Sequence, residues 1–276
     1  MSDLPPVPPE PTPPAPGLPP RRPPRGSDPD PGRSPERPDL DWPAATWRWW
    51  EVVLAYLIGA FVLGSIASLP IIALSGSEGV ALIAASIVID LVLLATLLVW
   101  LQRAHPTWRR IMGFPRRDAL AKETTAGFVS ALVILFVGGI VGVVVQKLLS
   151  MVSGDEVVQP DQLPSDLGSS GTVLAVVFVC IVAPVVEEFV FRGLLFRSIR
   201  DRYGLVLGVV LSGLAFGLVH FGVEGNVLDN LVLQIPLTVV GMGFAIVYEM
   251  RRNLVAPIAA HVMFNLIGII VILAEL

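Results

Sequence analysis

Residues 183–193 read A-P-V-V-E-E-F-V-F-R-G and lie within an apolar run that covers about 172–199. Arg192 follows Glu188 at i+4, so the two side chains share one helix face and can form an ion pair. Glu187 is turned about a quarter-turn away from that face and lacks this partner. Ionisable groups at membrane depth are costly, face the protein interior and are functional candidates. The alternative is an Arg–Glu pair that only joins two helices.

The composition is that of a membrane protein. Hydrophobic residues make up 54% of the 276 residues, charged residues 15%, and the mean hydropathy is +0.73. These values are typical of a polytopic bundle of apolar helices. The net charge of −4 is small, and we expect no nucleic-acid partner. Cys180 is the only cysteine, which excludes a disulfide framework and a thiolate metal cluster.

The first 43 residues differ from the rest of the chain. They hold 17 of the 25 prolines and almost no large apolar side chains. Such a segment cannot bury enough surface to fold, so we expect a disordered, Pro-rich cytosolic tail over residues 1–43. It lacks the apolar core of a signal peptide, so we expect no cleavage.

Seven apolar stretches follow the tail, each near the roughly 20 residues that cross a bilayer. They are placed at 51–74, 79–101, 125–150, 172–196, 204–222, 228–249 and 254–274. The expected fold is therefore all-α, a polytopic transmembrane helical bundle of about seven spans, with an eighth, re-entrant segment left open. Residues 44–155 would form accessory transmembrane helices, and residues 172–276 would form the catalytic core.

Basic residues fall on alternate sides of these stretches. Six arginines precede the first stretch, and the loop after the second holds five arginines and one lysine. The loops at 75–79, 153–171 and 222–226 hold none. By the positive-inside rule, this pattern predicts a multi-pass protein of the cell membrane with a cytosolic N-terminus and an external C-terminus. Tryptophans before the first stretch are expected at the membrane interface: Trp42, Trp47, Trp49 and Trp50.

Two of the three histidines lie in apolar stretches. His220 ends F-G-L-V-H, with Phe216 four residues earlier on the same helix face. His261 opens H-V-M-F-N, which places Asn265 one turn later on its own face. A lone buried histidine is usually a core residue with satisfied hydrogen bonds. Two of them beside a carboxylate pair in one small bundle indicate a site.

Helix lengths place Glu187 and His220 at one level. If a hairpin turns near Tyr203, Glu187 lies sixteen residues before the turn and His220 seventeen after it. At ~1.5 Å per residue both stand roughly 24–26 Å from the turn and can face each other. Asp90 is expected to line a substrate path or, more simply, to form a hydrogen bond between helices. Gln234 is expected to join helices in the same way.

The stretches E-E-F-V-F-R, F-G-L-V-H and H-V-M-F-N match, in order, the patterns EExxxR, FxxxH and HxxxN. In these motifs the chain resembles the CPBP intramembrane proteases, which include the type II CAAX prenyl endopeptidases and the lysostaphin-resistance-A-like proteins. The resemblance covers roughly residues 172–276. The earlier spans are only compatible with it, and the family says nothing about the proline-rich tail.

The resemblance implies an intramembrane endopeptidase that cleaves a membrane-associated peptide or protein, whether of CAAX type or another. Glu187 would be the general base, and His220 would help it to hold and activate a water. The oxyanion would be stabilised by His261 and Asn265, whose side chains can supply two donors aimed at one point. Supporting residues would be Glu188, Arg192 and Phe216.

No cofactor is expected, and a zinc ion is the alternative. Glu187, His220 and His261 could form a two-His, one-Glu site with an open position for water. The H-E-x-x-H helix of soluble zinc proteases is absent, however.

Two other classes of protein remain open. A proton-coupled transporter would use the same residues as a relay, but predicts an internal repeat that we do not find. A non-catalytic scaffold or immunity factor would bind a membrane partner, and the complete motifs argue against it. The oligomeric state does not follow from the sequence.

Overall fold

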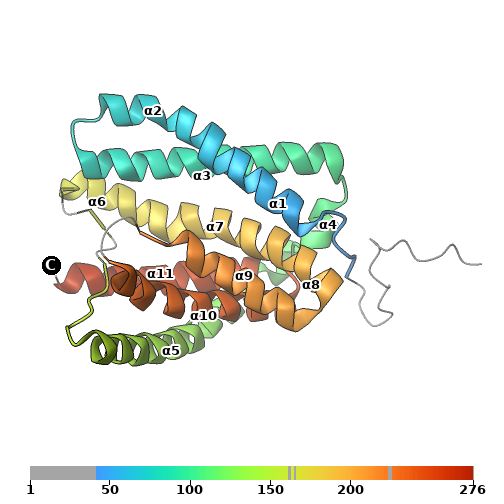
Figure 1. The fold of residues 1–276 in the computed structure, drawn as a ribbon. Coiled ribbons are helices and arrows are strands. Elements are labelled where there is room, and N and C mark those ends of the chain that lie inside the picture. Colours follow the sequence, from blue (N-terminus) through green and yellow to red (C-terminus); the bar gives the residue numbers. More distant parts are fainter. Residues whose placement is uncertain (1–41, 161–162, 165, 223–225, 276) are drawn as a thin grey trace, which may run out of the picture. The chain divides into compact units, whose positions relative to one another are not determined.

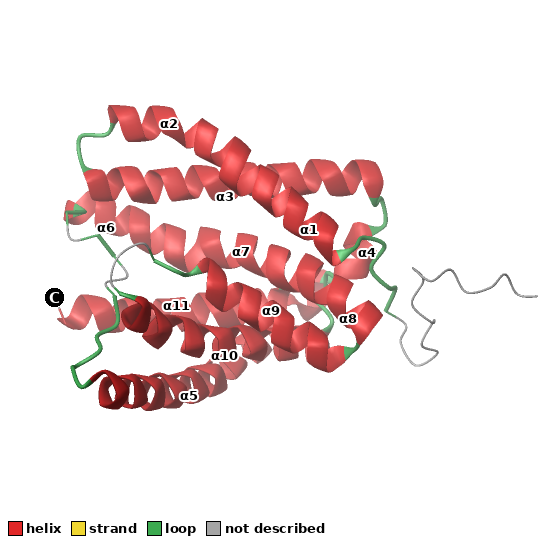
Figure 2. Cartoon of the chain, in the orientation of Figure 1, coloured by secondary structure: helices red, strands yellow, loops and turns green. Residues whose placement is uncertain are grey.

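The computed structural model describes residues 42–160, 163–164, 166–222 and 226–275, and all regular elements in that part of the chain are helices (Figures 1 and 2). The all-α class predicted from the sequence is therefore confirmed. Of the tail expected over residues 1–43, all but Trp42 and Pro43 lie outside the described residues.

The first half of the helical part is a long hairpin followed by a third long helix. The outgoing arm runs without a break through α1 (Trp49–Tyr56), η1 (Leu57–Gly64) and α2 (Ser65–Leu74). The returning arm is α3 (Glu78–Ala104), which lies beside it in Figure 1. Two short helices, α4 (Trp108–Met112) and η2 (Arg117–Ala119), then lead to α5 (Leu120–Ser153).

The second half begins with one continuous helix of 36 residues, Gly168–Tyr203, which we call the central helix. It consists of α6 (Gly168–Val177), η3 (Phe178–Val182), α7 (Ala183–Glu188), η4 (Phe189–Phe196) and α8 (Arg197–Tyr203). Gly204 ends it with a φ of 94°, a conformation that glycine adopts readily. The remaining helices are α9 (Leu205–Val219), α10 (Val227–Arg251) and α11 (Val255–Glu275).

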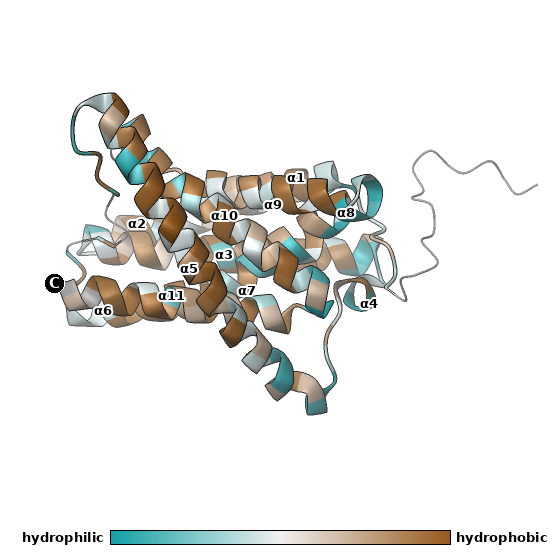
Figure 3. Cartoon of the chain, turned by 90° about the horizontal axis from the view of Figure 1, so that it is seen from below, coloured by the Kyte–Doolittle hydropathy of each residue, from teal (hydrophilic) through white to brown (hydrophobic). Residues whose placement is uncertain are grey.

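Six helices in the described part of the chain are long and apolar enough to cross a membrane. They are Trp49–Leu74, Glu78–Ala104, Trp108–Ser153, Gly168–Tyr203, Val227–Arg251 and Val255–Ile272. Apolar residues dominate these helices in Figure 3, and many of them are exposed, as a surface that faces lipid requires. The chain is a multi-pass membrane protein.

The fifth predicted stretch, 204–222, is shorter in the structure than the sequence indicated. It forms α9, which has only 15 residues and is about 22 Å long at 1.5 Å per residue. The hydrocarbon core of a typical bilayer is about 30 Å thick, so α9 is too short to cross it unaided. Of the seven predicted spans, six are therefore of full length and one is a short apolar helix.

The central helix lies between two groups of helices (Figure 1). α1 and α3 contact it on one side, and α9, α10 and α11 contact it on the other. α5 packs against α10 and α11 rather than against the central helix itself. The residues of the central helix are therefore placed where both groups of helices can add side chains to a site.

Close packing of α9 on α10 depends on two glycines one turn apart. A Cβ at Gly213 would lie 2.5 Å from Met242 Cγ. A Cβ at Gly217 would lie within 3 Å of both the Thr238 hydroxyl and a backbone carbonyl of α10. Small residues at this spacing let membrane helices approach closely. This contact fixes the face of α9 that carries Phe216.

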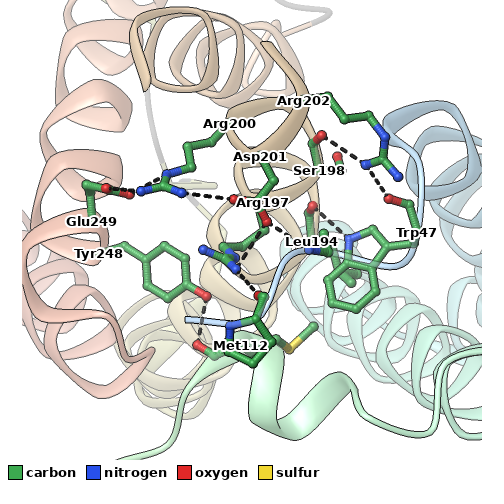
Figure 4. A network of polar contacts seen from close by, with 12 residues as sticks. Trp47, Met112, Leu194, Arg197, Ser198, Arg200, Asp201, Arg202, Tyr248 and Glu249 are labelled. Carbon is green, nitrogen blue, oxygen red and sulfur yellow. Dashed lines mark hydrogen bonds and ion pairs between the residues drawn. The ribbon is translucent and has the colours of Figure 1, made fainter. Parts of the chain in front are cut away.

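The tryptophans before α1 do not all lie at the surface. Trp49 and Trp50 are exposed, as predicted, but Trp42 and Trp47 are buried. The Trp47 indole nitrogen donates to the Leu194 carbonyl of the central helix at 3.0 Å (Figure 4). The burial of these two side chains had no local signal in the sequence, because their partners lie about 150 residues further along the chain.

Candidate functional site

Both glutamates of the E-E pair lie on α7, a short α-helical stretch between two π-helical segments, η3 and η4. A π segment contains a wider turn than an α-helix, so it changes the direction in which the following side chains point. Such segments occur frequently at functional sites in proteins. The central helix is therefore irregular on both sides of the pair that the sequence analysis singled out.

Glu188 and Arg192 form the ion pair that the i+4 spacing predicted. Arg192 Nη1 lies 3.0 Å from Glu188 Oε1, and both side chains are fully buried. Arg192 Nη2 also donates to the Gly241 carbonyl of α10 at 2.9 Å. The guanidinium lies 4.6 Å from the centre of the Phe216 ring, a cation–π distance. The pair thus joins the central helix to α9 and α10.

His261 binds the same carboxylate from the other side. Its Nδ1 lies 2.9 Å from Glu188 Oε1, and its ring stacks on Phe244 with centroids 4.7 Å apart. An ionised carboxylate can only accept, so Nδ1 donates the hydrogen in this contact. Nε2 points to the second glutamate, at 3.8 Å from Glu187 Oε2.

Glu187 has a different environment from its neighbour. Its side chain is 23% exposed, whereas that of Glu188 is 0% exposed. Its Oε2 is buried and makes no hydrogen bond within the described residues. The 3.8 Å separation from His261 is beyond hydrogen-bond distance. Glu187 is therefore the member of the pair that both reaches the protein surface and keeps an acceptor oxygen without a partner.

His220 is placed beside this group but does not touch Glu187. It caps the C-terminus of α9, and its Nδ1 lies 2.7 Å from the Phe216 carbonyl. A carbonyl only accepts, so Nδ1 donates and Nε2 is left as an acceptor. The His220 ring lies 4.8 Å from the Phe216 ring, which in turn lies 5.5 Å from the His261 ring. The Phe216 ring thus contacts the rings of both histidines.

Asn265 lies one turn beyond His261 on α11. Its side-chain nitrogen donates to the Val179 carbonyl of η3 at 2.7 Å. An amide nitrogen carries two hydrogens, so one of them remains for another acceptor. The structure thus brings six of the seven predicted site residues into one chain of contacts and leaves Asn265 bound to the adjoining turn of the central helix.

Two groups on the accessory helices also approach the site. Asp90 of α3 is close enough to interact electrostatically with Glu187, and so is Tyr56 of α1. The Tyr56 ring packs against the Phe191 ring at 6.5 Å. The helix-to-helix hydrogen bond expected for Asp90 is not found within the described part of the chain. The role of Tyr56 had no signal in the sequence, because a tyrosine in an apolar helix usually belongs to the core.

The residues proposed as zinc ligands do not converge in this arrangement. Within the residues that the structure describes, no group of three His, Cys, Asp or Glu side chains could hold a metal ion. Glu187 lies 3.8 Å from His261, and the Nδ1 of His220 bonds to the Phe216 carbonyl of its own helix. The zinc alternative therefore remains a matter for the chelator experiment described below.

Comparison with known protein families agrees with this geometry. Residues 169–267 match the family model described as type II CAAX prenyl endopeptidase Rce1-like. Because of this similarity we call residues 169–267 the Rce1-like segment. It contains all three motifs and extends from the start of α6 into α11. The family resemblance inferred from the motifs is thereby confirmed.

Three similar proteins match stretches of different length, and only the match to the third covers most of the chain. YdiL of Bacillus subtilis, named as a candidate membrane peptidase, is 30% identical over 92 residues, which are 33% of this chain and 34% of that protein. An uncharacterized protein of Mycoplasma capricolum is 30% identical over 105 residues, 38% of this chain and 29% of that one. The membrane-embedded CAAX protease MroQ of Staphylococcus aureus is 28% identical over 240 residues, 82% of this chain and 88% of MroQ.

The chain thus spans about a third of the first two relatives and most of MroQ. No solved structure gives a significant match to it. Because the similarity to MroQ covers more than the Rce1-like segment, it includes helices of the accessory half.

Proposed function

We propose that the protein is an intramembrane endopeptidase in which Glu187 activates a water for attack on a peptide carbonyl. The observation that carries the proposal is the contrast within the E-E pair. Glu188 is fully buried and bound, whereas Glu187 is partly exposed and has a free acceptor oxygen beside His261. A general base must reach both the substrate and the proton that it removes, and only Glu187 meets that condition.

Glu188 would orient the site rather than take part in proton transfer. Its oxygen Oε1 contacts both Arg192 and His261. A hydrogen bond from Nδ1 to a carboxylate fixes the tautomer and the direction of a histidine ring, as in other hydrolases that use histidine. Glu188 thereby presents His261 Nε2 toward Glu187, and the buried guanidinium of Arg192 compensates the charge of Glu188.

The proposed reaction uses these groups in sequence. A water bound by Glu187 and by the acceptor nitrogen of His220 gives a proton to Glu187 as its oxygen forms a bond to the scissile carbonyl carbon. The oxyanion would be stabilised by the second amide hydrogen of Asn265 and by His261 Nε2 when that nitrogen is protonated. The C–N bond then breaks, Glu187 passes the proton to the leaving amine, and a carboxylic acid and an amine are released.

The proposed substrate is a peptide or protein at the membrane, and a prenyl group is not required by anything in the site. The printed description of the family and the name of MroQ both refer to CAAX proteases, which makes lipidated C-terminal peptides a reasonable first set to test. We also propose that the chain lies in the membrane with a cytosolic N-terminus and an external C-terminus, as the positive-inside pattern indicates.

The test is hydrolysis of a quenched fluorescent peptide library, lipidated peptides included, by the detergent-purified full chain. Glu187→Gln keeps the size of the side chain but removes the base, and should abolish turnover. Glu78→Gln, at an exposed position in the first turn of α3, is the matched control and should retain it. Turnover that survives a chelator supports the glutamate mechanism proposed here.

Three other outcomes would contradict the proposal. Loss of turnover with chelator and recovery with zinc would establish the metal-dependent version of the protease. Equal turnover in Glu187→Gln and wild type would place the base elsewhere. An absence of turnover across the whole library would favour a membrane scaffold, an immunity factor or a proton-coupled transporter.

A further inference from the structure

The backbone of η3 leaves one carbonyl without a helical partner. The N–H of Ala183 bonds to the Phe178 carbonyl, five residues back, as in a π-helix. In an α-helix, the N–H of Ala183 would have bonded to the Val179 carbonyl. If the π pattern continued, the donor to that carbonyl would be the N–H of residue 184. Residue 184 is proline, which has no N–H. The Val179 carbonyl therefore receives a hydrogen bond from neither register.

A side chain of the site supplies the missing donor. Asn265 Nδ2 lies 2.7 Å from the Val179 carbonyl oxygen. Backbone polar groups in the interior of a membrane protein need a partner, because no water is available to replace a lost one. The hydrogen bond also holds the amide group of Asn265 in one plane, since the two hydrogens on its nitrogen are fixed relative to each other. Once the first hydrogen is directed at Val179, the direction of the second is set.

Two contacts therefore align α11 with the central helix. His261 binds Glu188 of α7, and Asn265, one turn later, binds Val179 of η3. Both partners lie on the part of the central helix that contains Pro184. Glu188 lies four residues after the proline, and Val179 lies five residues before it. A change in the hydrogen bonding of η3 would thus act on Asn265 without touching the contacts of His261.

We propose that Pro184 is a positioning residue of the site. By withholding an N–H from the Val179 carbonyl, it leaves an acceptor that orients Asn265, so that the second amide hydrogen of Asn265 points to the developing oxyanion. This inference rests on the proposed function for its catalytic consequence. The hydrogen-bond arrangement on which it depends is independent of any reaction.

The Pro184→Ala variant tests the idea directly. Alanine supplies an N–H that can bond to Val179, so Asn265 loses its acceptor and its fixed direction. We expect kcat to fall about 10- to 100-fold, a loss of the order seen for a misplaced oxyanion donor, with KM little changed. The thermal unfolding midpoint should stay the same or rise, because a proline is removed from a helix interior. If Pro184 had a purely structural role, Pro184→Ala would lower the unfolding midpoint and leave kcat unchanged.

A double variant separates orientation from stability. Asn265→Ala alone should lose turnover and lower the unfolding midpoint, since the Val179 carbonyl is then buried without a donor. Adding Pro184→Ala should restore the midpoint, because the new N–H replaces the lost amide, but should not restore turnover. Pro236→Ala is the matched control, since Pro236 lies inside α10, and it should leave turnover unchanged.

Wild-type turnover in Pro184→Ala would overturn the proposal, and so would equal midpoints of Asn265→Ala with and without the second substitution. If the wild-type protein cleaves no peptide, the proposed function fails and the catalytic part of this inference fails with it. The midpoints of the four proteins still report whether Asn265 and the backbone of residue 184 compete for Val179. The two failures are therefore distinguishable.

Discussion

Two clusters of charge lie on the same helix and are built differently. The first is the site around Glu187 and Glu188, in which each glutamate has an Oε2 without a hydrogen-bond partner within the described residues. The second, which we call the anchor cluster, is formed by Arg197, Arg200 and Asp201 of α8 with their partners (Figure 4).

In the anchor cluster both carboxylate oxygens of Asp201 are used. Oδ2 accepts from the Ala45 backbone at 2.8 Å and lies 3.1 Å from Arg197, and Oδ1 accepts from Arg200 at 3.1 Å. The Arg197 guanidinium also lies 3.6 Å from the centre of the Trp42 ring. A carboxylate with all its acceptors occupied has no capacity left for a substrate. The anchor cluster therefore holds the segment before α1 against the central helix. The site differs because it has carboxylate oxygens that remain available as acceptors.

Of the substitutions that test the difference between the two clusters, one at Glu187 should have the largest effect on turnover. Glu187→Gln should lower kcat by about 10²–10⁴-fold, the usual range for loss of a general base. The unfolding midpoint should not fall, because the buried Oε2 of Glu187 has no hydrogen-bond partner to lose. Single-turnover rates and thermal unfolding of the same preparation would check both. A lower midpoint would show that Glu187 is structural after all.

Glu188 should behave differently although it is the adjacent residue. Glu188→Gln leaves the buried guanidinium of Arg192 without its counter-charge, which destabilises by about 3–5 kcal/mol in comparable buried pairs. Turnover should also fall, because His261 loses the carboxylate that orients it. Denaturant unfolding in detergent measures the first effect. The double variant Glu188→Gln/Arg192→Met removes both charges and should recover part of the stability.

A substitution in the anchor cluster should lower the stability of the fold without changing turnover. Asp201→Asn removes a carboxylate that accepts a hydrogen bond from Arg200 and forms an ion pair with Arg197, and a hydrogen bond to a charged group contributes about 1.5–3 kcal/mol. The free energy of unfolding should fall by about that amount, with kcat per folded molecule unchanged. Asp155→Asn, in an exposed loop, is the control. If kcat fell with Asp201→Asn in the folded protein, the two clusters would be coupled rather than separate.

The smallest effect is expected at Asp166, an exposed carboxylate that accepts two hydrogen bonds at one oxygen. Its Oδ2 accepts from the Gly79 backbone and from the Ser77 hydroxyl, both at 3.1 Å. These bonds, that from Gly79 first, hold the pKa of Asp166 below its ordinary value of 3.8. A lowered pKa stabilises the fold above the ordinary value and loses that contribution as pH falls through the folded value.

Asp166→Asn should therefore lower the unfolding midpoint slightly at neutral pH. The midpoints of the variant and the wild type should converge as the medium becomes acid. A difference between them that is independent of pH would mean that the side chain acts through its shape rather than its charge.

Short-range patterns in the sequence predicted the helical class and the similarity to CAAX-type proteases. The spacing of Glu188 and Arg192 predicted their ion pair, and the turn between His261 and Asn265 placed both on one face of α11. These predictions rest on helix periodicity, which is local. The depth arithmetic brought Glu187 and His220 to one level but could not show that the Phe216 ring lies between His220 and His261.

Features that depend on distant partners were not predictable. Trp42 and Trp47 were assigned to the membrane interface by their type, yet their burial depends on Arg197 and on the Leu194 carbonyl. The π segments were not predicted either. Side chains of other helices bond to backbone carbonyls within two of these segments, as Asn265 does to Val179 and as Ser212 does to Phe191.

The short length of α9 has a consequence for the lipid around the protein. A helix of 15 residues is several ångströms shorter than the acyl region of a typical membrane, and a bilayer adapts to such a mismatch by thinning beside the helix. His220 lies at the end of α9, so lipid headgroups and their water would come closer to the site there than elsewhere. We therefore expect faster turnover in vesicles of short-chain lipids than in vesicles of long-chain lipids, with equal rates as the contrary result. Membrane thickness would then be a variable to which the enzyme responds.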